Sequence, residues 1–253
     1  MALATYTATV ERTASFWDCG EFIACSFKLQ VPHPPGSPLF LLIGRLFSML
    51  ALGDVSRVAY WVNMVSVAGS AFSILFLFWT ITMLGRKFLD KKDHQLTSAE
   101  GFLVLGSALV GALAYTWSDS FWFSAVEAEV YGLSSFFTAI VIWAAFKWER
   151  IEDEAAANRW LIFTAYLTGL SIGVHLLNLV TIPALALIYF FKKYDPTFWK
   201  GVLAVLVGLV ILVIINSGII PGLPSMAGSF EIFFVNTLGL PYATGVVFFV
   251  VAF

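Results

Sequence analysis

Two carboxylates and a histidine lie close together near the start of the chain. Asp18 and Glu21 are three residues apart, so a helix would place both on one face. Such a pair can separate its pKa values and give a general base near neutral pH, or it could hold a divalent cation. His33 lies within the proline-rich residues 32–36, which cannot continue a helix. The alternative is an acidic helix N-terminus followed by a loop, but the full combination favours a site.

A second group of polar residues lies within residues 115–133. Asp119, Glu127, Glu129 and Tyr131 stand where an apolar run begins, and acids that enter a span are costly and usually functional. Glu127 and Glu129 are two apart and cannot share a helix face, so we expect one to face a site and favour Glu127. Asp119 is interpreted as a cap of the following span.

A third group interrupts the long apolar run 160–191. His175 and Asn178 are one helical turn apart, near a glycine and a proline. A lone histidine is often a core residue satisfied by a backbone carbonyl, yet this one is expected on the same side as Asp18, so both interpretations stay open. Residues 217–245 are interpreted as an outer surface loop at the membrane interface.

The composition predicts an integral membrane protein. Of 253 residues, 60% are hydrophobic and 12% are charged, whereas soluble domains average about half and about a quarter. The net charge of -2 indicates no nucleic-acid partner. Cys19 and Cys25 would lie about 9 Å apart along one helix, too far for a disulfide. No phosphate-binding loop or dinucleotide fingerprint occurs, so no organic cofactor is expected.

Apolar runs of about 20 residues mark candidate spans. These runs cover residues 58–84, 101–117, 125–146 and 201–219, with two short helices in 160–191 and a last span from about 243. Residues 39–52 are too short to cross, so they lie along the interface or re-enter. The chain opens like the end of a span and stops inside an apolar run, so we expect a fragment showing about seven spans.

Basic residues predict the orientation. Ten of the 14 lysines and arginines lie in loops 86–100, 147–159 and 192–200, while residues 116–126 and 216–242 contain none. The positive-inside rule places the three basic loops in the cytoplasm. Four basic residues remain in the first outer segment, where they either meet an anionic ligand or pair with local acids: Arg12, Lys28, Arg45 and Arg57.

Two stretches carry a resemblance to a known family. FWDCGEFIACSFKLQVPHPPGSPLF and FWFSAVEAEVYGL resemble signature stretches of the membrane proteins of the domain of unknown function 2723 family. That family is similar to the protein O-mannosyltransferases and, more widely, to the GT-C glycosyltransferases. The first stretch is the more specific because it joins D-x-G-E to H-P-P-G at a fixed distance. The family pattern has a complete span before it and further spans after it, which this chain lacks.

The resemblance implies an all-α, GT-C-like transmembrane bundle over residues 1–253, with a juxtamembrane or re-entrant first outer loop at 11–57. It implies an inverting glycosyltransferase in a bilayer, most simply the bacterial inner membrane with its site facing the periplasm. The donor would be a polyprenyl-phosphate-linked sugar and the acceptor a Ser or Thr of an exported protein. Asp18 would be the base and Glu21 its partner. Substrate contacts are expected from His33, Arg45, Arg57, Glu127, Tyr131, His175 and Asn178, with the arginines and His175 as phosphate binders by position alone.

Two other functional classes remain open at this point. A secondary transporter also places acids and histidine between broken helices, but near mid-membrane and within an internal repeat. A non-catalytic membrane subunit would need no convergent acids.

The orientation is testable by cysteine labelling in intact cells. A cysteine placed at Lys92 is expected to resist a membrane-impermeant thiol reagent until the cells are permeabilised, because the charged loop 86–100 would face the cytoplasm. Labelling of position 92 in intact cells would reverse the proposed orientation.

Overall fold

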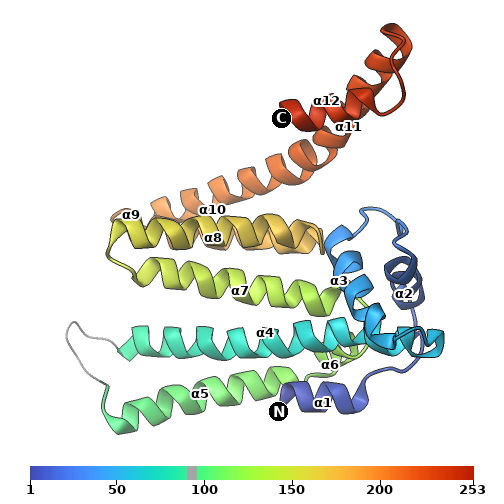
Figure 1. Cartoon of the computed structure of the whole chain (residues 1–253). Coiled ribbons are helices and arrows are strands. Elements are labelled where there is room, and N and C mark those ends of the chain that lie inside the picture. Colours follow the sequence, from blue (N-terminus) through green and yellow to red (C-terminus); the bar gives the residue numbers. More distant parts are fainter. Residues whose placement is uncertain (90–95) are drawn as a thin grey trace. The chain divides into compact units, whose positions relative to one another are not determined.

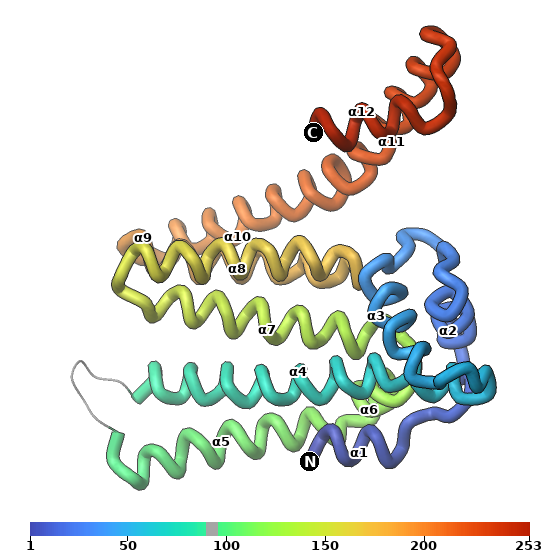
Figure 2. The backbone as a smooth tube through the Cα atoms, viewed as in Figure 1, coloured from blue at the N-terminus to red at the C-terminus, as the bar shows by residue number. Residues whose placement is uncertain are grey.

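The computed structural model describes residues 1–89 and 96–253, and every regular element within these ranges is helical (Figures 1 and 2). Lys91 and Lys92 lie outside the described residues. Five helical segments are long and apolar enough to cross a membrane: Val55–Leu89, Ser98–Thr116, Val130–Arg150, Leu176–Lys193 and Phe198–Thr237. The expected all-α polytopic class is therefore confirmed. The chain divides into two compact units, Met1–Thr181 and Ile182–Phe253.

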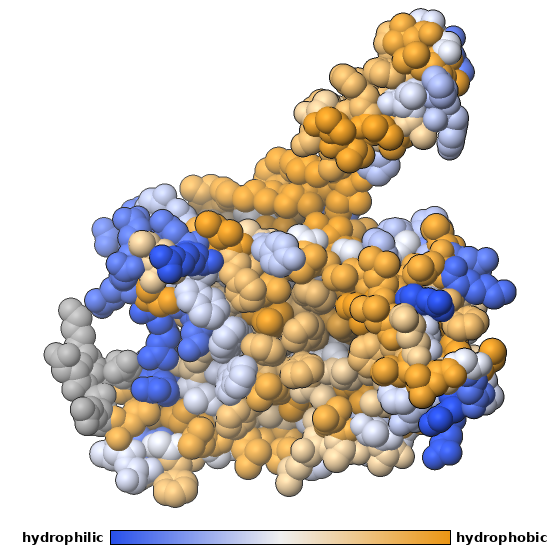
Figure 3. Space-filling view, viewed as in Figure 1, coloured by the Kyte–Doolittle hydropathy of each residue, from blue (hydrophilic) through white to orange (hydrophobic). Residues whose placement is uncertain are grey.

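Four long helices form the body of the first unit. They are α4 (Val58–Leu89), α5 (Ser98–Thr116), α7 (Val130–Arg150) and α8 (Glu154–Ile172). Helix α4 packs against both α5 and α7, and α7 packs against α8 (Figure 1). The 32 residues of α4 rise about 48 Å along the helix axis, which exceeds the thickness of the hydrocarbon core of a bilayer. Figure 3 shows hydrophobic side chains over the middle of these helices and hydrophilic ones towards their ends.

Helices α4 and α7 approach each other through small residues. A Cβ atom at Gly69 would lie 2.9 Å from the Cα atom of Leu133, and one at Gly132 would lie 2.7 Å from Ser70 Oγ. Small residues let helix backbones pack closely inside a membrane, where apolar side chains gain little by leaving lipid. This contact places the start of α7 beside the first half of α4.

The short elements of the first unit gather at one end of the long helices. They are α1 (Ala2–Thr9), α2 (Cys19–Lys28), α3 (Pro38–Ser48), η1 (Met49–Ala51), η2 (Val55–Arg57), α6 (Asp119–Ala125) and η3 (Leu176–Thr181). The apolar stretch Pro38–Ala51 is too short to be a candidate span, as expected for residues 39–52. At the opposite end, Lys87 Nζ lies 2.6 Å from Glu149 Oε1, so the loops after α4 and α7 begin side by side.

Two expectations about the spans need a more exact description. Helix α7 begins at Val130 and not at residue 125, so Glu127 and Glu129 precede the helix. The long apolar run 160–191 is interrupted as predicted, because α8 ends at Ile172 and the next α-helix begins at Ile182. The two cysteines lie in α2 as free, buried side chains.

The second unit overturns one expectation. It contains α9 (Ile182–Lys193), α10 (Phe198–Val213), η4 (Ile214–Ile219), α11 (Ile220–Ile232), η5 (Phe233–Thr237) and α12 (Thr244–Ala252). Residues Phe198–Thr237 are continuously helical, so the outer loop expected at 217–245 is wrong for residues 217–237.

Pro221 and Pro224 lie within this helical stretch, in α11. A π-helical segment, η4, directly precedes these prolines and keeps the chain helical where their missing N–H groups disturb the α pattern. Glu231 is also engaged, since its Oε2 accepts a 3.0 Å hydrogen bond from the N–H of Val246 in the first turn of α12.

The close contact between α4 and α7 predicts the cost of added volume. Gly69→Val should lower the melting temperature in detergent, because the new side chain meets the backbone of α7 and overpacking of this kind costs about 1–3 kcal/mol. Gly106→Val is the matched control, because a Cβ at Gly106 in α5 meets no atom within 4 Å. Equal melting temperatures for the two variants would contradict the close approach.

Candidate functional site

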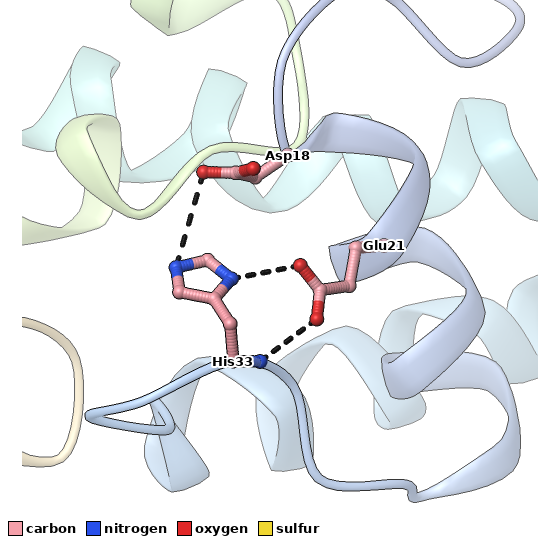
Figure 4. Close-up of polar contacts among 3 residues, drawn as sticks. All are labelled: Asp18, Glu21 and His33. Carbon is pink, nitrogen blue, oxygen red and sulfur yellow. Dashed lines mark hydrogen bonds and ion pairs between the residues drawn. The ribbon is translucent and has the colours of Figure 1, made fainter.

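The candidate site is built on the first turn of α2 and the loop that follows this helix. Asp18 is the N-cap residue of α2, and Glu21 lies in its first turn. The helix ends at Leu29, whose backbone is left-handed (φ 52°), and the proline-rich residues 32–36 then return the chain towards the helix start. His33 thereby comes to lie between the two carboxylates (Figure 4).

Glu21 holds His33 with both carboxylate oxygens. Oε1 accepts a 2.8 Å hydrogen bond from the backbone N–H of His33, and Oε2 lies 2.7 Å from ring atom Nδ1. The other ring nitrogen, Nε2, faces Asp18 Oδ2 at 3.9 Å. The ring also packs edge-on against Phe22 at 6.0 Å between centroids. The orientation of the imidazole is therefore fixed on three sides.

The aromatic residues around this turn differ in exposure. Trp17 is 87% exposed, as an interfacial anchor would be, whereas Phe22 is only 4% exposed and packs on Phe40. Phe22 therefore takes part in the packing of α2 on α3.

The charges of the three residues reinforce one another. The hydrogen bonds from the side chain and the backbone of His33 lower the pKa of Glu21. In turn, the bond to Glu21 raises the pKa of His33, and the nearby carboxylates of Asp18 and Glu129 raise it further. The site therefore favours a positive charge on His33.

A buried acid lies near this cluster, in the segment between α6 and α7. Glu129 is 5% exposed, and the backbone N–H groups of Asp18 and Val130 donate to its carboxylate. Burial, followed by the charges of Asp18 and Glu127, raises the pKa of Glu129 to about 7. Its Oε1 has no hydrogen-bond partner among the described residues. The charge of Asp18 is therefore felt by this buried acid.

Glu127 occupies a different environment. It is 2% exposed, accepts a hydrogen bond from Ser15 and lies near Glu11, and burial raises its pKa. The sequence favoured Glu127 as the acid facing the site, but the structure places Glu129 beside Asp18 and His33. The pattern could not separate them, because both residues precede the helix whose faces were being compared. A substrate contact by Glu127 stays a prediction.

The side-chain amide of Asn63 joins the segments that carry these acids. From the first half of α4, its Nδ2 donates to the backbone oxygens of Glu11 and Thr13 at 2.7 and 3.1 Å. Its Oδ1 accepts from the N–H of Ala128 at 2.8 Å and faces the thiol of Cys19 at 3.7 Å. Asn63 was not singled out from the sequence, although a fully buried amide inside an apolar span is itself a signal.

His175 and Asn178, the polar residues that interrupt the apolar run 160–191, have different neighbours. The rings of Tyr131 and His175 are in contact, with centroids 5.5 Å apart, and burial lowers the pKa of His175. The buried amide of Asn178 accepts from Thr138 Oγ1 at 2.7 Å and donates to the backbone oxygen of His175, and a substrate contact by Asn178 stays a prediction. The N–H of Leu39 donates to the oxygen of Gly173 at 2.7 Å and ties α3 to this region.

The two candidate arginines lie on the short elements of the first unit. Arg45 donates to the backbone oxygen of Phe27 and lies 5.5 Å from the centre of its ring, so it closes the end of α2. Arg57 is exposed beside Asp54. Phosphate binding by Arg45, Arg57 or His175 stays a prediction.

A cavity of about 620 Å³ lies among α4, α5 and α7. Its wall is mainly apolar, with hydroxyl groups at intervals, and Tyr131 and Leu177 line it near His175. The hydroxyl-bearing residues of its wall are Ser73, Thr80, Tyr115, Ser134, Ser135 and Thr138. The sequence did not predict this cavity, since its lining comes from α4, α5, α7 and η3, which are separate in the chain.

Comparison with known proteins gives one family. Residues 18–197 match the family described as the protein O-mannosyl-transferase TMEM260 N-terminal domain. Protein O-mannosyl-transferase TMEM260 of Mus musculus is 31% identical over 179 residues, which are 71% of this chain and 22% of the mouse protein. The Dictyostelium discoideum protein of that name is 25% identical over 188 residues, 70% of this chain and 21% of the relative.

The chain thus spans about a fifth of the length of the relatives it matches. No solved structure matches. The matches confirm the expected likeness to protein O-mannosyltransferases, whereas membership of the domain of unknown function 2723 family stays a prediction.

The pairing of His33 with Glu21 predicts a titration. In metal-free buffer, NMR of labelled histidine should give His33 a pKa above 6.5 and His175 a pKa below it. Glu21→Gln should return His33 towards its ordinary value. Because the folded-state pKa is raised, the stability from this pair is full below pH 6.5 and is lost as pH rises through the raised pKa. An unchanged His33 pKa in Glu21→Gln would contradict the pairing.

Proposed function

We propose, because this chain belongs to the family of the protein O-mannosyl-transferase TMEM260 N-terminal domain, that it is the membrane part of a glycosyltransferase. The enzyme transfers a sugar from a polyprenyl-phosphate donor to a Ser or Thr hydroxyl of a protein. The observation that carries this proposal is the constellation of Asp18, Glu21 and His33 at one membrane edge, inside the matched region.

Asp18 is the proposed general base. Both oxygens of Glu21 bind His33, whereas the Asp18 carboxylate is 54% exposed and lies 3.9 Å from the ring. The acceptor hydroxyl oxygen attacks the anomeric carbon, and Asp18 takes the hydroxyl proton as the new C–O bond forms. The bond from the anomeric carbon to the phosphate oxygen breaks, and polyprenyl phosphate leaves with the electron pair. Attack opposite to the leaving group inverts the anomeric centre.

The leaving phosphate needs positive charge, and His33 offers it beside the base. The carboxylates around His33 raise its pKa and so favour the imidazolium. A fixed cation placed where negative charge develops stabilises the transition state. Glu21 acts in this scheme as a positioning residue, because it orients the imidazole and does not itself meet the hydroxyl.

The apolar cavity among α4, α5 and α7 supports a lipid-linked donor. Its volume of about 620 Å³ lies within the range of small-molecule sites, and its mainly apolar wall suits part of a polyprenyl chain. Tyr131 lines the cavity and contacts His175, so the cavity reaches the end of the first unit that carries the acids. His175 and Tyr131 are then placed to contact the donor.

The proposed side of the membrane follows from the charges. Lys87 and Glu149 pair at the end of the first unit opposite the acids, where the basic loops begin. The positive-inside rule makes that end cytoplasmic. Transfer is therefore proposed on the non-cytoplasmic side, which is the periplasmic side if the membrane is a bacterial inner membrane.

The proposed base predicts a large loss of activity. Asp18→Asn should reduce transfer of label from a polyprenyl-phosphate sugar to protein by about 10²- to 10⁴-fold, because Asn cannot accept the hydroxyl proton. Glu21→Gln should cost less, since Gln retains one acceptor for His33. Asp119→Asn is the matched control, because Asp119 is an exposed acid in the first turn of α6.

The variants separate the alternatives. A larger loss in Glu21→Gln than in Asp18→Asn would exchange the two roles within the same mechanism. Near-normal transfer in both variants, in protein that remains folded and in the membrane, would exclude this motif as the catalytic site and favour a transporter or a non-catalytic subunit.

A further inference from the structure

We infer that Asn63 is a positioning residue for this site, which fixes Asp18 relative to α4 without touching the substrates. The side chain lies in the second turn of α4 and is fully buried. The inference rests on the proposed function in one respect, since it takes Asp18 to be the base. The contacts of Asn63 do not themselves depend on that reaction.

The first observation is that the amide of Asn63 is completely engaged. An asparagine side chain offers two N–H donors and one oxygen with two lone pairs. Nδ2 donates to the backbone oxygens of Glu11 and Thr13 at 2.7 and 3.1 Å. Oδ1 accepts from the backbone N–H of Ala128 at 2.8 Å and from the thiol of Cys19 at 3.7 Å. All four hydrogen-bonding positions of the amide are in use, so the groups that it contacts are held against α4.

The second observation is where these partners lie in the chain. The two backbone oxygens that accept from Asn63 precede Asp18, whereas Cys19 follows Asp18 directly as the first residue of α2. The contacts therefore lie on both sides of Asp18. Between them, Trp17 has a left-handed backbone (φ 57°), a conformation that is costly for residues other than glycine and persists where neighbouring contacts hold it. The amide thus holds the turn that leads into Asp18.

The third observation is that α4 does not itself use this amide. The hydroxyl groups of Ser73 and Thr82, on the same helix, donate to backbone oxygens of α4 four residues earlier. The partners of Asn63 all lie in other segments, between 44 and 65 positions away. A buried amide is costly in an apolar span, and an apolar residue of similar size would serve the packing of α4. The long-range bonds are therefore the reason for a polar residue at this position.

The consequence falls on the chemical step and not on substrate binding. A displacement of about 1 Å in a reacting group can cost about 100-fold in rate. Loss of the amide should move Asp18 away from the hydroxyl proton and so lower kcat. The KM for the lipid-linked donor should stay close to that of the parent protein, because Asn63 is enclosed and meets no substrate.

Kinetics of the full-length protein test this inference. Asn63→Leu keeps the size of the side chain but removes both polar groups. Its kcat for transfer from a polyprenyl-phosphate sugar should fall about 100-fold, with KM changed by less than about threefold. Asn63→Ser is a milder second variant, in case the leucine variant does not fold, since the hydroxyl is too short to join both segments.

Ser70→Ala is the matched control. It removes a buried polar group from the same helix, and Ser70 Oγ has no hydrogen-bond partner among the described residues. Its kcat and KM should equal those of the parent protein.

A double variant separates positioning from a general effect on the structure. If Asn63 acts through Asp18, Asn63→Leu should cost no more than about twofold further in an Asp18→Asn background, because the base is already absent. A merely structural role predicts a further loss close to that of the single variant. Such an additive loss, a parent-like kcat in both Asn63 variants, or a rise in KM alone would overturn the inference.

Hydrogen exchange of the same proteins separates this inference from the proposed function. Peptides that cover residues 9–22 and 120–130 should exchange at least about tenfold faster in Asn63→Leu than in Ser70→Ala, whereas exchange in α8 should be unchanged. Faster exchange confined to these segments, together with normal sugar transfer by Asp18→Asn, would keep Asn63 as the residue that holds this turn and remove Asp18 as the base. Unchanged exchange in both segments would overturn the inference, whatever the activity.

Discussion

The buried amide of Asn63 is the interaction on which the arrangement of the acids depends. It joins α4 to the backbone of residues 11–13 on one side and to Ala128 on the other, so two segments more than 100 residues apart meet at one point. An amide can both donate and accept, and a network in which every member is paired is far more rigid than its separate bonds in water. The backbone N–H of Glu11 also donates to the oxygen of Val126 at 2.9 Å, so the segments that carry Asp18 and Glu129 are joined beside this amide as well.

The long helices supply the second constraint. Gly69 and Gly132 let α4 and α7 approach closely, and Ser66 Oγ on α4 then reaches the backbone oxygen of Glu129 at 3.0 Å. The position of the buried acid is thus set by helix packing within the membrane, whereas Asp18 and Glu21 are set by the start of helix α2. The site joins a rigid half to a half that is accessible to substrates.

Sequence patterns predicted the parts of this structure that depend on local order. Runs of apolar residues gave the long helices, and the spacing of Asp18, Glu21 and His33 was sufficient to propose one cluster, because a short helix and a stiff loop connect them. The rest depends on contacts between distant segments. The positions of Glu127 and Glu129 are set by hydrogen bonds from Asn63 and Ser66, which lie on another helix. Pro221 and Pro224 are accommodated by a π-helical turn, which the periodicity of the sequence does not reveal.

The contacts of Asn63 constrain which residues of this fold can vary between relatives. Its partners at Glu11, Thr13 and Ala128 are backbone atoms, so the side chains there can change without loss of any of these bonds. The amide itself has no substitute of equal length, since aspartate lacks the donor and leucine lacks both groups. Distant relatives should therefore keep an asparagine near the start of an otherwise apolar helix, while the sequences of the loops around it change. That single position could guide alignments of sequences too divergent for the loop motifs to be recognised.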